Sequence, residues 1–133
     1  MPEILAGKPR VFVVDHDQVT GAAYAKLLTW YGFKASFFYP FEALDAAHFS
    51  APDLLIADAA MPGISGLDLA VLLRGICPEC KVVLVVFPAM KDDMMLATRK
   101  AGHMFEFLTR PVVSGELVYA AQRMLELRPR ASN

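Results

Sequence analysis

The sequence predicts an α/β fold in which five parallel strands alternate with five helices. Short runs of β-branched and apolar residues recur along the chain, and each run is followed by a segment with apolar residues at helical spacing. The runs are apolar throughout, which is typical of strands that are buried on both faces. Because strand–helix–strand connections are right-handed, we expect a three-layer sandwich with helices on both sides of one sheet.

The first half of the chain contains two of these strand–helix units. The run Val11–Val14 predicts the first strand, and residues 17–31 predict a helix that stops at Gly32, where a C-terminal glycine is expected. Residues 34–39 and 41–47 predict the second strand and a short helix.

The second half repeats the same order. The last helix has Ser114 as its expected N-cap. The predicted elements are a strand at 53–58, a helix at 67–74, a strand at 82–86, a helix at 92–100, a strand at 105–108 and a helix at 115–127.

Length and composition indicate one ordinary domain. The chain has 133 residues, of which 56% are hydrophobic, so it is long enough for one well-filled core and too short for two. We expect a lead at residues 1–8, one domain over 9–127, and a tail or the start of a linker at 128–133. The net charge of −1 argues against direct binding of nucleic acid or an anionic membrane. Short apolar runs and no signal-peptide pattern predict a cytoplasmic protein.

Charged residues follow three of the predicted strands where each strand ends. Asp15 and Asp17 follow the first strand, Asp58 ends the third, and Arg110 follows the fifth. In an open parallel sheet these strand ends meet near the point where strand order reverses. Carboxylates brought together there repel unless a cation lies between them, and hard oxygen ligands suit Mg²⁺. The pattern therefore predicts a magnesium site of the kind used in phosphoryl transfer.

Residues 9–127 resemble the receiver domains of two-component response regulators. Val13-Val14-Asp15-His16-Asp17 is similar to the acidic cluster of that family, and residues 58–66 reproduce its Asp-x-x-Met-Pro-x-x-x-Gly motif. Ala101-Gly102 and Arg110-Pro111 fall where the family has Ala-Gly and Lys-Pro. The resemblance implies a flavodoxin-like (βα)5 fold with strand order 2-1-3-4-5.

The same resemblance implies a role for each of these residues. Asp58 would accept a phosphoryl group from a histidine kinase or phosphotransfer protein, and Arg110 would contact that group. Phe107 lies at the aromatic switch position, and the peptide bond before Pro111 is expected to be cis. The implied ligands of Mg²⁺ are Asp15, Asp17, Asp58 and the backbone carbonyl of Ala60, with His16 at a usual ligand position.

The sequence departs from the family at three of these positions. Phe87 stands where the family has a Ser or Thr whose hydroxyl receives the phosphoryl group, and Arg110 stands in place of Lys. His16 stands at the position of a carboxylate ligand, although imidazole is a poor ligand for Mg²⁺. We therefore expect weak or altered phosphorylation. From side-chain volume we also expect the Phe87 ring to fill the space into which Phe107 would rotate.

Output is expected through protein contacts. The partner would be a downstream protein, a fused effector or a second copy of the chain, bound through the helix at 92–100, the strand at 105–108 and the last helix. The predicted output face comprises Met94, Met95, Arg99, Met104, Phe105 and Tyr119.

Two other functions remain open at this point. Asp15-His16-Asp17-Gln18-Val19 also resembles the opening of haloacid-dehalogenase-like phosphatases, with Asp15 as nucleophile and Asp17 as acid or base. The other alternative is a phosphorylation-independent scaffold. Apart from the phosphatase alternative, we expect no enzymatic activity beyond self-catalysed phosphotransfer to Asp58 and hydrolysis of the product. Cys77 and Cys80 form a CxxC pair, but its place after a helix argues against a redox motif.

Overall fold

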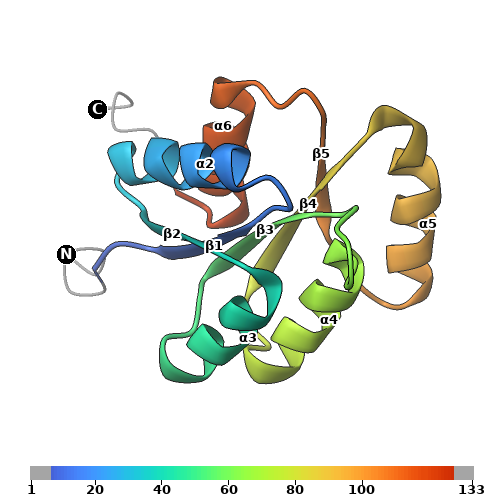
Figure 1. Ribbon diagram of the computed structural model, residues 1–133, viewed down its shortest axis with the longest axis horizontal. Coiled ribbons are helices and arrows are strands. Elements are labelled where there is room, and N and C mark those ends of the chain that lie inside the picture. The colour runs from blue at the N-terminus through green and yellow to red at the C-terminus, as the bar shows by residue number, and fades with distance from the viewer. Residues whose placement is uncertain (1–6, 128–133) are drawn as a thin grey trace.

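The computed structural model describes residues 7–127, so most of the expected lead and all of the expected tail at 128–133 lie outside the described residues. Within this part the predicted alternation of strands and helices is confirmed (Figure 1). No helix of the described part has the length and apolar character to cross a membrane. The elements are β1 Arg10–Val14, α2 Gln18–Trp30, β2 Lys34–Phe38, α3 Pro40–Phe49, β3 Leu54–Asp58, α4 Gly66–Ile76, β4 Lys81–Val86, η1 Pro88–Met90, α5 Lys91–Lys100, β5 Glu106–Thr109 and α6 Ser114–Met124.

The strands form one parallel sheet in the order β2-β1-β3-β4-β5, as the resemblance implies. The chain runs from β1 to β2 on one side and then returns to place β3 on the other side of β1. Strand order therefore reverses between β1 and β3, and such a switch point leaves a crevice at the carboxyl ends of the strands.

Alternate residues of the central strands enter two separate cores. Val13 and Ile56 face the layer of α2 and α6, whereas Phe12 and Leu55 face the layer of α3 and α4. Figure 1 shows these two helix pairs on opposite faces of the sheet, with α5 beside β5 at one edge. Because the central strands are buried on both faces, they carry the continuous apolar runs that are visible in the sequence.

Gly66 sets the distance between α4 and the end of β3. A Cβ atom at this position would lie 2.2 Å from the carbonyl oxygen of Asp58, closer than any side chain could be placed. The helix begins there because the Ser65 hydroxyl accepts a hydrogen bond from the backbone N–H of Asp68 at 3.1 Å. The last glycine of the motif therefore lets α4 start directly against the strand that ends in Asp58.

Several predicted boundaries move by a few residues, and one predicted cap is wrong. The N-cap of α6 is Val113, not Ser114, because the carboxylate of Glu116 accepts the Val113 backbone N–H at 3.2 Å and no hydroxyl is needed. The same helix ends at Met124, short of residue 127, and Glu126 has a φ of 57°. The 3₁₀ turn η1 before α5 was not predicted.

Candidate functional site

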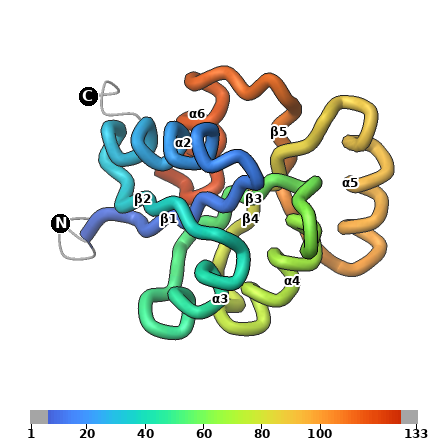
Figure 2. The backbone as a smooth tube through the Cα atoms, viewed as in Figure 1, coloured from blue at the N-terminus to red at the C-terminus, as the bar shows by residue number. Residues whose placement is uncertain are grey.

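The residues that end β1, β3 and β5 come together at the carboxyl edge of the sheet. Figure 2 shows the turns after β1 and β3, in blue and green, meeting at this edge. One ligand atom from each of Asp15, His16 and Asp58 lies within 4.8 Å of the others. Arg110 reaches the same group from the end of β5. The sequence prediction that these strand ends share one site agrees with this geometry.

Arg110 bridges the two buried carboxylates. Its Nη2 atom lies 3.0 Å from Oδ2 of Asp15 and 3.2 Å from Oδ1 of Asp58. The guanidinium side chain is 17% exposed, and the two carboxylate side chains are 2% and 1% exposed. Burial works to lower the pKa of Arg110, but the hydrogen bond to Asp15 and the charges of both carboxylates raise it overall. The site therefore contains a permanent cation.

His16 forms the second side-chain contact with Asp58. Its Nδ1 atom is hydrogen-bonded to Oδ2 of Asp58, and this hydrogen bond raises the pKa of the imidazole. Burial works to raise the pKa of Asp58, but hydrogen bonds from His16, from the backbone N–H of Ala60 at 3.1 Å and from Arg110 outweigh it and lower the pKa. Asp58 is therefore held in its ionised form.

Asp17 does not join this cluster, although the sequence analysis named it as a ligand. It is the N-cap of α2: Oδ1 accepts the Val19 backbone N–H at 3.1 Å, and Oδ2 accepts the Thr20 hydroxyl at 2.7 Å. The hydrogen bond from Thr20 is the main cause that lowers the pKa of Asp17. Only its backbone N–H contacts the site, by donating to Oδ1 of Asp15 at 2.9 Å. This arrangement offers no support for Asp17 as the acid or base of a phosphatase.

The residues present do not fit Mg²⁺ well, although the resemblance described above implies this ion. His16 offers an imidazole nitrogen to this cluster, whereas Mg²⁺ prefers oxygen ligands. Each of the four carboxylate oxygens already accepts a hydrogen bond or ion pair from an N–H group of the chain. Ala60 is brought to the site by its N–H group, and its carbonyl as a metal ligand stays a prediction.

Phe87 lies against Arg110. Its side chain is half exposed, and the guanidinium carbon of Arg110 lies 5.7 Å from the centre of its ring. The flat guanidinium offers the aromatic ring a favourable cationic face. Phe107 packs, partly buried, against the core on the side of α3 and α4, and the expectation that Phe87 fills the space into which Phe107 would rotate stays a prediction.

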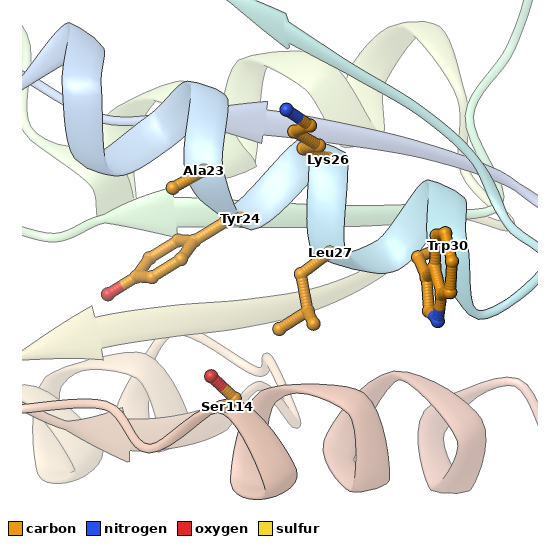
Figure 3. Close-up of a pocket in the computed structure, with 6 residues that line it drawn as sticks. All are labelled: Ala23, Tyr24, Lys26, Leu27, Trp30 and Ser114. Atoms are coloured by element: carbon orange, nitrogen blue, oxygen red, sulfur yellow. The ribbon is translucent and has the colours of Figure 1, made fainter.

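Two cavities border α2, and the α2 residues that line them were not identified as site residues from the sequence. One, of about 500 Å³, is lined by Thr20, Tyr24, Phe87, Arg110, Pro111 and Val112. Thr20 and Tyr24 are four residues apart on α2 and follow the predicted acidic turn, which is the signal that could have found them. The other, of about 480 Å³, lies between α2 and the start of α6. Figure 3 shows Leu27 pointing across it toward Ser114, with Trp30 at its far end.

The predicted output face is partly exposed and partly packed. Arg99, Met104 and Tyr119 are exposed, and Met104 is 80% exposed. Met94 and Phe105 are partly buried and pack against the core on the side of α3 and α4, and Met95 is also partly buried. The Arg110–Pro111 peptide bond is cis, the form that the resemblance implies.

Cys77 and Cys80 are buried in the turn between the end of α4 and the start of β4, at the opposite edge of the sheet from the cluster. Burial raises the pKa of both thiols, that of Cys80 to about 12. A thiol is reactive as the thiolate, so these side chains act as small apolar groups in the core beside α4.

Comparisons with known proteins agree with this geometry. A family model described as response regulator receiver domain matches residues 11–122. The transcriptional regulatory protein PrrA of Mycobacterium tuberculosis is 29% identical over 121 residues, which cover 90% of this chain and 51% of that protein. The C4-dicarboxylate transport transcriptional regulatory protein DctD of Rhizobium meliloti is 28% identical over 125 residues, which cover 93% of this chain and 27% of that protein.

Solved structures show the same fold. The crystal structure of the receiver domain of NtrX from Brucella abortus superimposes with a TM-score of 0.78 at 24% identity, covering 89% of this chain and 99% of that one. The chain therefore corresponds to a whole domain in that structure, whereas it spans at most about half the length of the two curated relatives.

Proposed function

Because the chain belongs to the response regulator receiver domain family, we propose that Asp58 is its phosphoacceptor in two-component signalling. The observation that supports this most directly is the placement of an ionised carboxylate at the end of β3, beside a guanidinium that can contact an incoming phosphoryl group. The fold and the motif that begins with Asp58 support this assignment.

The proposed chemistry is the transfer of one phosphoryl group. An Oδ atom of Asp58 attacks the phosphorus of a phosphohistidine, the P–N bond breaks, and an acyl phosphate forms. Oδ2 is hydrogen-bonded to His16, and Oδ1 accepts from Ala60 and forms an ion pair with Arg110, so neither oxygen is free of contacts before attack. Phe87 has no hydroxyl to receive the phosphoryl group. We therefore propose slow phosphorylation, and no enzymatic activity beyond this transfer and the hydrolysis of its product.

The proposed partners follow from the same assignment. The phosphoryl donor is a histidine kinase or a phosphotransfer protein. The output surface is the exposed part of α5, β5 and α6, including Arg99, Met104 and Tyr119, and its partner is a downstream protein, a fused effector or a second copy. Two relatives are named transcriptional regulatory proteins, which is consistent with an effector beyond the matched segment.

Intact mass spectrometry after incubation with acetyl phosphate tests the proposed acceptor. The unmodified chain should gain one phosphoryl group over a long incubation, and Asp58→Asn should gain none. Asp53→Asn is the matched control because Asp53 is an aspartate outside the site whose carboxylate accepts the backbone N–H of Arg10 at 2.7 Å. The incubation is run once with Mg²⁺ and once with a chelator.

Two results would contradict the proposal. An adduct that persists in Asp58→Asn would place the acceptor elsewhere. The absence of any adduct, both from acetyl phosphate and from a panel of histidine kinases, would favour a phosphorylation-independent scaffold.

A further inference from the structure

We infer that the side chains of His16 and Arg110 together replace a divalent cation, so that the site formed by Asp15 and Asp58 is complete without a metal. The inference rests on the assignment of this cluster as the phosphoacceptor site, but not on whether Asp58 is in fact phosphorylated.

The first argument is the occupation of the carboxylate oxygens. Oδ1 of Asp15 accepts the Asp17 backbone N–H at 2.9 Å, and Oδ2 of Asp15 lies 3.0 Å from Arg110. Oδ1 of Asp58 lies 3.2 Å from Arg110 and accepts from Ala60, and Oδ2 is hydrogen-bonded to His16. Each of the four oxygens therefore already has an N–H partner, and a divalent ion bound between the carboxylates would have to share these oxygens with those partners.

The second argument concerns the imidazole itself. His16 uses Nδ1 to contact Asp58, and the same atom lies 3.7 Å from Oδ1 of Asp15. A ring nitrogen that donates its N–H to a carboxylate has no lone pair to offer a metal. To become a ligand, Nδ1 would have to lose its proton and its hydrogen bond with Asp58.

The third argument is the balance of charge. Two buried carboxylates face one guanidinium and one imidazole, so two negative groups meet two basic groups at close range. Adding a divalent ion would give the largely buried group of Asp15, Asp58 and Arg110 an excess of positive charge, which burial makes unfavourable. Replacing His16 by Asp would give three carboxylates against one guanidinium, a set of oxygen ligands that calls for a divalent cation.

The test is a titration of the unphosphorylated chain with MgCl₂, and separately with MnCl₂, in the unmodified protein and in His16→Asp. Binding is followed by the ¹H–¹⁵N NMR shifts of Asp17 and Ala60 and by the thermal unfolding midpoint. Gln18→Asp is the matched control, because Gln18 is exposed and the change adds the same charge two residues away from His16. Ionic strength is held constant with NaCl.

We expect neither ion to shift the site resonances or the midpoint of the unmodified chain or of Gln18→Asp beyond the effect of NaCl. His16→Asp should bind Mg²⁺ at least about tenfold more tightly than the unmodified chain. If this variant unfolds without metal, recovery of its folded spectrum on addition of Mg²⁺ gives the same result.

Two results would overturn the inference. One is saturable binding of Mg²⁺ or Mn²⁺ to the unmodified chain in the millimolar range, with shifts at Asp17 and Ala60. The other is a His16→Asp variant that is folded but gains no affinity for Mg²⁺. Failure of acetyl phosphate to modify Asp58 would contradict the proposed function and leave these results unchanged, so the two failures can be told apart.

Discussion

Removal of the Arg110 charge should destabilise the fold by more than any exposed substitution. Arg110→Met keeps most of the aliphatic stem but leaves Asp15 and Asp58, which are 2% and 1% exposed, without the guanidinium that bridges them. Breaking a buried ion pair by removing one partner costs about 3–5 kcal/mol. Because His16 still contacts Asp58, we expect the lower end, about 3 kcal/mol.

Urea unfolding at 25 °C, followed by circular dichroism, measures this loss directly. Arg99→Met is the control, because Arg99 is an exposed arginine in the last turn of α5, and its removal should change the free energy of unfolding by less than about 0.5 kcal/mol. The double variant Arg110→Met/Asp15→Asn should lose less than the sum of its single variants, since it also removes one of the orphaned charges.

The pH dependence gives a second check on the same reasoning. The pKa of Asp58 is depressed in the folded protein, so the stability it contributes is present above the unfolded pKa of about 3.9 and is lost as the pH falls through the folded pKa. The penalty of Arg110→Met should therefore shrink below about pH 4. If Arg110→Met lowers the free energy of unfolding at pH 7 by less than about 1 kcal/mol, as an exposed substitution would, the argument that the two carboxylates depend on Arg110 is refuted.

Gly66→Ala and His16→Asn test other parts of the site, and Gly115→Ala serves as the control for the first. Gly66→Ala should cost about 1–3 kcal/mol, because its Cβ would lie 2.2 Å from the carbonyl oxygen of Asp58, whereas Gly115→Ala, where a Cβ meets nothing within 4 Å, should be neutral or stabilising by about 0.5–1 kcal/mol. Equal effects of the two changes in urea unfolding would contradict the close approach of α4 to β3. The pKa of His16 is raised in the folded state, so the stability it contributes is full below the unfolded pKa of about 6.5 and is lost as the pH rises through the folded pKa. As the pH rises above about 6.5, through the folded pKa, the unmodified chain should therefore lose stability relative to His16→Asn, and parallel urea midpoints for the two proteins would count against the His16–Asp58 contact.

The alternation of strands and helices was predictable because its signal is spread over many residues. Each central strand is buried on both faces and reads as an unbroken apolar run, so errors of a residue or two at its ends do not change the fold. The motif at residues 58–66 was recognised from the resemblance to receiver domains, and the structure gives a physical reason for its last glycine, because a Cβ atom at Gly66 would lie 2.2 Å from the carbonyl oxygen of Asp58.

The roles of single polar side chains were harder to predict. Asp15 and Asp17 are two residues apart in one turn, and only the observed path of the chain decides that one enters the site while the other caps α2. Ser114 was a reasonable cap by residue type, but α6 begins one residue earlier, and Glu116 accepts the backbone N–H of Val113 from inside the helix. Such choices depend on local hydrogen bonds between neighbouring residues, and residue preferences alone do not resolve them.

Phe87 and Arg110 are far apart in the sequence, but their side chains are in contact, so the residue at one position affects which residue suits the other. Arg110 follows β5 and reaches past the end of β4 to the carboxylates of β1 and β3, and Phe87 is the residue that directly follows β4. A lysine at position 110 would have a compact ammonium with no flat face for the ring, and a small hydroxyl residue at position 87 would leave one side of the guanidinium uncovered. We therefore expect Phe87 and Arg110 to depend on each other, so that exchanging either residue alone removes the contact that the other one makes.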